Sequence, residues 1–458
     1  ASDDIIFFNN LNGGTATLAA GGSVSLVRAT LNTLSADAGR DISIARLTAK
    51  STSLTSGAKT TATGLIDSDV LTVVAGTDAS FVDVKSKTLE ISAGGNLTAR
   101  TVRGYTAKLT AKGDVKANGD IDADTLTIAS GANASLASLS AQRLTVTAGG
   151  DLAAMNVNAD VVKMTSGGDL TVRGKLYGGQ TNLDASGDVT VGGNTDVNAL
   201  TVKSGANVQL AKVKTRGNMQ VQAGGKLELK QDASSGGNMY LTAHEISVRN
   251  LTSKRFLTAL SETTFVGSDL SAGGDLRVHT YGDMTFNDAT AGGSAWILGL
   301  GSSAARLKFH TLRTGGRDTA VLLEHGYLDF WHVTAGLDVA IGVRTYVTPE
   351  DPAVSSGTFE SLQPDTAYRI FYPWGRSLMP KDPFNFHVPD LLHDYAAGKD
   401  DIDSQGSEGE DAFNAFLQKL AREARQMWPL RILDLDHGED AIEIRLDQYD
   451  YWLPEEAQ

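Results

Sequence analysis

Apolar and polar residues alternate in short stretches along the first three-quarters of the chain. From Leu144 to Ala148, the apolar Leu144, Val146 and Ala148 are separated by two threonines. A period of two is typical of a β-strand with one buried face. A glycine pair follows at 149–150, and a second alternating stretch then begins. The pattern predicts short strands joined by tight turns, in which we expect glycine to adopt positive φ.

The same phrase of strand and turn recurs about every 19 residues. The third residue of each phrase gives a register with steps of 18 to 20 residues, and weaker copies extend the series from Leu34 to Leu298. We expect the register positions to form one buried column. The ten clearest of them are Val73, Ile91, Leu109, Ile128, Val146, Met164, Leu183, Val202, Val221 and Leu241.

One unit of this length cannot bury its apolar face alone, but stacked units give every strand a parallel neighbour above and below. The sequence therefore predicts a mainly β fold, a parallel β-helix or β-solenoid of about 15 coils, with a length of roughly 70 Å. Proline supports this prediction, because it removes a backbone donor from the ladder. All 9 prolines lie at Pro349 or later.

The composition changes toward the C-terminus, where all five tryptophans lie at Trp296 or later. The net charge of −14 also arises entirely after residue 345. Neither part has a basic surplus, so a nucleic-acid partner is disfavoured. The predicted domains are a solenoid over 1–345 with irregular closing coils from about 296, a loop-rich segment with aromatic residues and proline over 346–395, an acidic linker over 396–411, and a small α+β appendage of one helix and a β-hairpin over 412–458.

The phrase LTVTAGGDL at 144–152 and the 19-residue spacing between about 15 and 300 resemble the repeats of filamentous haemagglutinin-like exoproteins, the adhesins of bacterial two-partner secretion systems. The resemblance implies a right-handed parallel β-helix, export through an outer-membrane transporter and a role in adhesion. The Asn-Pro motifs of the family's secretion domain and the cysteine pair of some members do not occur in this sequence. With no signal peptide at Ala1 and no long apolar run, we expect an interior or C-terminal part of such a protein without a transmembrane segment.

Each group of residues that could form a site also has a structural explanation. Asp or Asn after the glycine pair, as at Asp151, suits a turn better than calcium, because calcium-binding β-rolls repeat every nine residues. In the acidic linker, a solvated segment is favoured over a metal site. The candidate metal ligands there are Asp400, Asp401, Asp403, Glu408, Glu410 and Asp411. An aromatic cluster could contact a ligand or form the core of a cap. Its members are Tyr368, Tyr372, Trp374, Phe384 and Phe386.

These observations favour a non-enzymatic stalk, secreted or on the bacterial surface, that needs no cofactor. Its expected partners are a host or bacterial surface glycan or protein, or another copy of the chain. The sequence shows no nucleophile–base pattern, and the 18–20-residue coils lack the insertions that form a cleft in β-helical enzymes. A self-assembling filament subunit, a β-helical carbohydrate-active enzyme and a C-terminal toxin remain alternative hypotheses.

Overall fold

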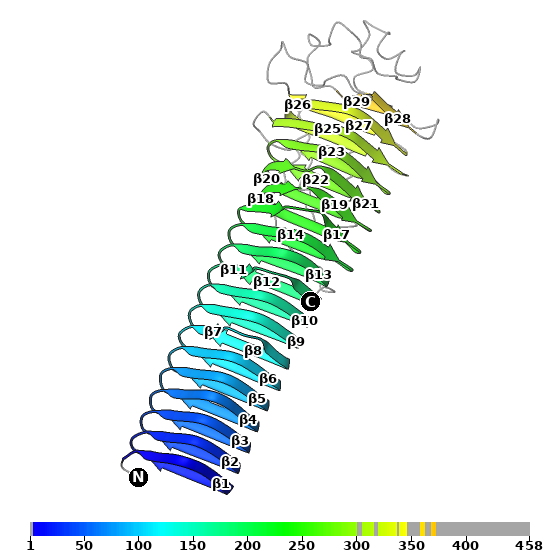
Figure 1. Ribbon diagram of the computed structural model, residues 1–458. Coiled ribbons are helices and arrows are strands. Elements are labelled where there is room, and N and C mark those ends of the chain that lie inside the picture. The colour runs from blue at the N-terminus through cyan, green and yellow to red at the C-terminus, as the bar shows by residue number, and fades with distance from the viewer. Residues whose placement is uncertain are drawn as a thin grey trace, which may run out of the picture. The chain divides into compact units, whose positions relative to one another are not determined.

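The computed structural model describes residues 3–299, 305–315, 319–336, 339–345, 358–361 and 368–371. Within these residues the chain forms 29 strands and no helix, and every strand pairing is parallel. Successive coils of about 19 residues lie one above another, making about 17 turns (Figure 1). The predicted parallel β-solenoid is confirmed, with slightly more coils than the sequence indicated.

The strands are described in chain order, as a first series in the N-terminal part of the solenoid and a second series that follows it. The first series is β1 (Ile5–Ala20), β2 (Val24–Ala38), β3 (Ile42–Ser56), β4 (Thr60–Ala75), β5 (Ala79–Ala93), β6 (Leu97–Ala111), β7 (Val115–Ala117), β8 (Ile121–Ser130), β9 (Ala134–Ala148), β10 (Leu152–Ser166), β11 (Leu170–Val172), β12 (Leu176–Ala185), β13 (Val189–Ser204) and β14 (Val208–Thr215). The second series is β15 (Met219–Ala223), β16 (Lys226–Leu229), β17 (Ala233–Ser235), β18 (Met239–Val248), β19 (Asn250–Ser253), β20 (Leu257–Val266), β21 (Asp269–Ala272), β22 (Leu276–Thr280), β23 (Met284–Ala291), β24 (Ala295–Gly299), β25 (Ala305–Thr314), β26 (Thr319–Ala335), β27 (Val339–Thr345), β28 (Thr358–Ser361) and β29 (Tyr368–Phe371).

One coil has three inward-facing stretches. In β10, Leu152 and Ala154 are buried on the first side, Val157 and Ala159 on the second, and Val162, Met164 and Ser166 on the third. Two consecutive residues that are not buried separate each stretch from the next, at 155–156 and 160–161. Because side chains alternate strictly within a strand, such a pair marks a corner where the chain turns. The core is therefore a set of apolar columns enclosed by three strand faces.

The register predicted from the sequence is the register of the stack. Each of the ten positions is the parallel partner of the next, from Val73 opposite Ile91 to Val221 opposite Leu241. No side chain in this column is more than 1% exposed. Stacking removes both sides of each apolar residue from water, which is the main favourable term in a fold of this kind.

The glycines at the turns have a different role from the one predicted. Among the described glycines, only Gly326 has positive φ. A Cβ on Gly149 would lie within 3.0 Å of the Gly131 carbonyl oxygen, and one on Gly150 would lie within 3.0 Å of Asn133 Oδ1 in the coil below. Glycine is therefore favoured because adjacent turns approach closely. Lys112 takes the same turn position in another coil, so a local shift can admit a side chain.

The last coils are longer and carry aromatic residues in the core. Ala291 pairs with Thr314 and Ala295 with Thr319, which are steps of 23 and 24 residues. Inward-facing Phe286, Phe309 and Phe330 stack in successive coils, with ring centroids 5.1 and 5.5 Å apart. These rings fill the wider coils, since aromatic side chains bury more area than aliphatic ones.

The parallel stack continues past the boundary predicted at residue 345. β28 pairs with β26 and β29 pairs with β27, so the segment 346–395, predicted to be rich in loops, contributes two short strands to the stack. Unpaired backbone groups at the end of β26 and β27 explain this pairing, because an added strand satisfies them. The predicted acidic linker at 396–411 and the appendage at 412–458 lie outside the described residues.

Candidate functional site

In eight successive coils, the turn that follows the longest face carries a ladder of Asp and Asn side chains. In each step, the Oδ1 atom of one coil accepts a hydrogen bond from the backbone N–H at the same position of the next coil, over 2.8–2.9 Å. The ladder runs through Asp78, Asn96, Asp114, Asn133, Asp151, Asp169, Asp188 and Asn207 and ends on the N–H of Lys226.

The ladder shows how Asp and Asn act in the turns where the sequence predicted them. A turn leaves backbone N–H groups without a partner in their own coil, and a side-chain oxygen of the neighbouring coil accepts from one of them. Either Asp or Asn suffices, because both have an Oδ1 acceptor. In the part of the chain that the structure describes, no group of three His, Cys, Asp or Glu side chains is arranged to hold a metal ion.

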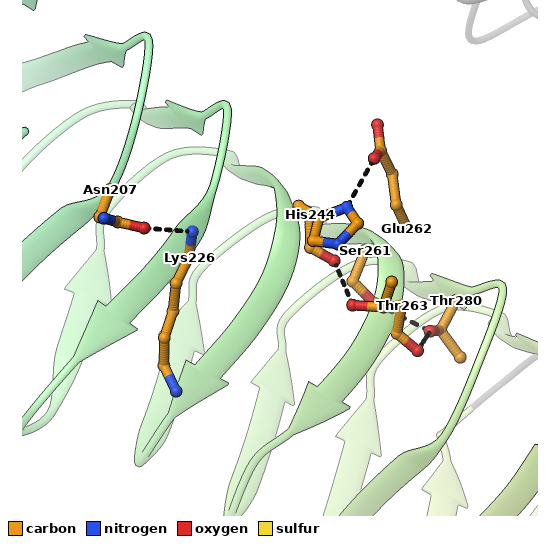
Figure 2. A network of polar contacts seen from close by, with 7 residues as sticks. All are labelled: Asn207, Lys226, His244, Ser261, Glu262, Thr263 and Thr280. Carbon is orange, nitrogen blue, oxygen red and sulfur yellow. Dashed lines mark hydrogen bonds and ion pairs between the residues drawn. The ribbon is translucent and has the colours of Figure 1, made fainter. Parts of the chain in front are cut away.

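Beyond Lys226 the corner is held by a different set of polar contacts (Figure 2). Lys226 Nζ pairs with Glu245 Oε1 at 2.5 Å, and His244 Nδ1 lies 2.9 Å from Glu262 Oε2. The Thr263 hydroxyl donates to the His244 carbonyl at 2.9 Å. The ion pairs are exposed and lie between adjacent coils, where each contributes little to stability.

The same corner holds a hydroxyl pair that could be mistaken for part of a hydrolytic site. Ser261 is buried, and its hydroxyl donates to Thr280 Oγ1 at 2.9 Å, while Thr280 donates to the Thr263 carbonyl (Figure 2). A serine nucleophile needs a base within hydrogen-bond reach and access to substrate. The contacts of Ser261 instead satisfy buried polar groups at a turn.

The outer face of β20, β22 and β24 differs from that of the earlier coils. Thr258, Arg277 and Trp296 are register partners on these strands, and all three are buried although they point away from the core. The Arg277 guanidinium lies 4.3 Å from the centre of the Trp296 ring, a cation–π geometry. Its Nη2 atom is also 3.8 Å from Asp275 Oδ2. At these three positions the strands are thus buried on both faces.

A neighbouring histidine, His279, is half-buried on the same outer face. Burial lowers the pKa of His279 to about 4, and the positive charge of Arg277 adds to the effect. The imidazole is therefore neutral near pH 7. The sequence signal for this face is the change from polar to apolar outer positions, at Trp296 and Leu298. Strands buried on both faces have nearly continuous apolar runs of this kind.

A second group of side chains lies at a corner of β23, β25 and β26. Asp288 Oδ1 accepts a hydrogen bond from the Thr311 hydroxyl at 2.6 Å and lies 3.2 Å from His310 Nδ1. The hydrogen bond from Thr311 lowers the pKa of Asp288, and His310 lowers it further. The His310 ring stacks on Trp331 with a centroid distance of 5.6 Å, and Trp331 is 68% exposed. We call these four residues the Trp331 cluster.

The predicted ligand-contact residues are not brought together by the described part of the structure. Tyr368 is the first residue of β29, where its backbone is the partner of Val339. The other four aromatic candidates and all six acidic candidates lie outside the described residues. These are Tyr372, Trp374, Phe384, Phe386, Asp400, Asp401, Asp403, Glu408, Glu410 and Asp411.

The sequence pattern does not point to the Trp331 cluster, because Trp331 falls within the closing coils predicted from about residue 296. One sequence signal could have located it, because side chains alternate along a strand. With Phe330 pointing inward, the next residue, Trp331, must point outward.

Searches against protein-family models, curated proteins and solved structures found no match to this chain. Among the residues that the structure describes, no helix is long and apolar enough to span a membrane.

Proposed function

We propose that this protein is an extracellular, non-catalytic stalk that mediates attachment to a surface or to matrix. The observation that carries the proposal is the unbroken stack of coils with one register and a continuous Asp/Asn ladder along one corner. Each coil contacts only its neighbours, so such a stack extends in one direction without a larger core. A stack of this kind suits a protein that holds a contact site away from its point of anchorage.

The outer surface of the shaft supports a structural role over a catalytic one. Its outward positions are mainly small or polar, as in β9, where Ser135, Ser140 and Thr147 are exposed. The coils keep a length of 18–20 residues from β1 to β22, with no inserted loop that would enclose a substrate. Ligand sites in proteins are usually concave and enclosed, and enzymes especially so.

We further propose that the chain belongs with the filamentous haemagglutinin-like exoproteins and is exported by an outer-membrane transporter. Support comes from the repeat length and the phrase at 144–152, together with the parallel solenoid that the resemblance implied. A transporter gene beside the gene for this chain would agree with the proposal. A cytoplasmic location of the natural protein, measured by cell fractionation, would contradict it.

Self-assembly is a second candidate, favoured by the first coil. Among the described strands, β1 pairs with β2 alone. Its inward-facing Ile5, Phe7 and Leu11 remain partly exposed. An open strand edge beside apolar side chains is a template for another strand, from a second copy or from preceding residues of a longer chain. Regular polymers of the isolated chain in electron micrographs would favour this candidate over simple attachment.

The attachment function can be tested with beads that carry the full chain. We expect coated beads to adhere to bacterial or epithelial cell surfaces more strongly than beads coated with an unrelated protein of similar charge. A variant with Val146 replaced by Asp, which places a carboxylate in the core, should reduce adhesion if the folded stack is needed. Equal retention of the coated and control beads on every surface would refute the proposal.

A further inference from the structure

The Trp331 cluster combines an exposed aromatic ring with a rigid position in the fold. Trp331 lies in β26 next to Phe330, whose ring is buried and stacks on Phe309. The β26 backbone is held on one side by β25, through the pairs Phe330–Phe309 and His332–Thr311. An exposed indole loses little conformational entropy on binding when its backbone is already fixed, which favours such positions as contact sites.

The polar members of the cluster present acceptors next to the indole. Both contacts to Asp288 use Oδ1, from Thr311 and from His310, so lone pairs on Oδ2 are available to a ligand donor. When His310 Nδ1 donates its proton to Asp288, Nε2 of the neutral ring is an acceptor. The cluster therefore suits a ligand that has an apolar face and several hydroxyl donors at its rim.

The charges around the cluster favour an uncharged ligand. The negative charge of Asp288 is offset by Arg313, whose field lowers the pKa of that carboxyl. On the next strand face, Lys308 Nζ forms an ion pair with Asp329 at 3.3 Å. Among the described side chains around the cluster, these two carboxylates are matched by two fixed cations, so they give no surplus charge of either sign to attract a sulfated chain or a quaternary amine.

We propose that the Trp331 cluster is a binding subsite for a neutral saccharide. One pyranose ring would place its C–H face on the indole of Trp331, and its hydroxyls would donate to Asp288 and His310. The structure thereby assigns a ligand class and a location to the proposed attachment function, on which this inference rests. Another exposed aromatic ring, that of Tyr105, lies on a corner of β6 in an earlier coil and serves as a comparison.

The test measures binding of defined oligosaccharides to the full chain by calorimetry and by saturation-transfer NMR. The neutral probes are cellohexaose, laminarihexaose, chitohexaose and a linear mannohexaose, and the charged probes are a heparin hexasaccharide and phosphocholine. We expect at least one neutral probe to bind, with Trp331→Ala weakening it by about tenfold. Trp331→Phe should weaken it less, and Asp288→Asn should weaken it by about threefold or more. The matched control Tyr105→Ala, which removes another exposed ring, should leave affinity unchanged.

Several outcomes would overturn the subsite. These are the absence of binding by every neutral probe, binding of heparin or phosphocholine alone, and affinity for a neutral probe that Trp331→Ala leaves intact. The bead assay separates this inference from the attachment function. If the Trp331→Ala variant still attached to cells and still bound the saccharide as the wild type does, the subsite would be refuted and the attachment function would stand. A wild-type chain that adheres to nothing would refute the attachment function itself.

Discussion

Replacing Val146 with Asp would place a carboxylate in the centre of the apolar stack. Val146 is fully buried, and its partners in the adjacent coils are Ile128 and Met164, which are fully buried as well. No cation lies in this column to compensate a charge, since every one of the ten register positions is apolar. The carboxyl group must therefore remain protonated or distort the coil.

The expected cost follows from two terms. Burial raises the pKa of a carboxyl by up to about 3–5 units, and at pH 7 this corresponds to about 4 kcal/mol against an unfolded-state pKa near 3.9. Losing the buried valine side chain adds about 2 kcal/mol. The sum of about 6 kcal/mol is comparable with the whole stability of an ordinary domain. Because coils contact only their neighbours, we expect local opening of the central coils before global unfolding.

Amide hydrogen exchange provides the assay. In Val146→Asp, the amides of β8, β9 and β10 should exchange about a thousandfold faster or more, while β2 and β22 should change little. The matched control Thr147→Asp introduces the same charge one residue later, at an exposed position, and should cost less than about 0.5 kcal/mol. The destabilisation should shrink as the pH falls toward the unfolded-state pKa near 3.9 and below it, where the carboxyl becomes protonated in the unfolded state as well. Wild-type exchange throughout β9 would refute the predicted register.

Three further predictions concern the turns and the buried outer face. Asn133→Ala removes the acceptor of the Asp151 N–H and should destabilise the local coil by about 1 kcal/mol, seen as faster exchange of that amide, whereas Asn133→Asp keeps the acceptor and should cost less. Gly149→Ala should lower the denaturation midpoint by an amount equivalent to about 1 kcal/mol or more, because its Cβ meets the turn below; an unchanged midpoint would contradict the close-approach explanation. His279 binds a proton more readily in the unfolded state than in the folded state, because its folded-state pKa is about 4. Its contribution to the free energy of unfolding should therefore be constant above about pH 6.5, and that free energy should fall by up to about 3 kcal/mol as the pH drops to about 4. His279→Gln should flatten that pH dependence in chemical denaturation, and an unaltered slope would show that the imidazole is not buried neutral.

The sequence and the structure agree most closely where a pattern repeats. Alternation identified the inward residues of β9, and the repeat length identified their partners in β8 and β10, because a parallel stack aligns equivalent positions. Sequence reasoning also located Asp151 in a turn. It did not foresee that the side chain accepts from the coil above, since that contact joins residues 18 apart whose spacing depends on the stack.

The sites were less predictable than the fold. Trp331 and Asp288 are 43 positions apart in the sequence, and the steps between their coils are irregular, so no period places them at one corner. The burial of Arg277 on the outer face was also not foreseen. Composition indicates that a strand is apolar on both sides, but only its surroundings determine whether an arginine beside a tryptophan is exposed.

By itself, the sequence determined the parallel stack, its register and its apolar columns, because these depend on a local period that every coil repeats. The tertiary structure decided why the turns need glycine and what their Asp and Asn side chains do, because both depend on the separation of successive coils. It also decided which outward residues meet at the Trp331 cluster. Where coils differ in length, the residues that come into contact depend on how the chain turns in each coil. A local sequence pattern does not predict that alignment.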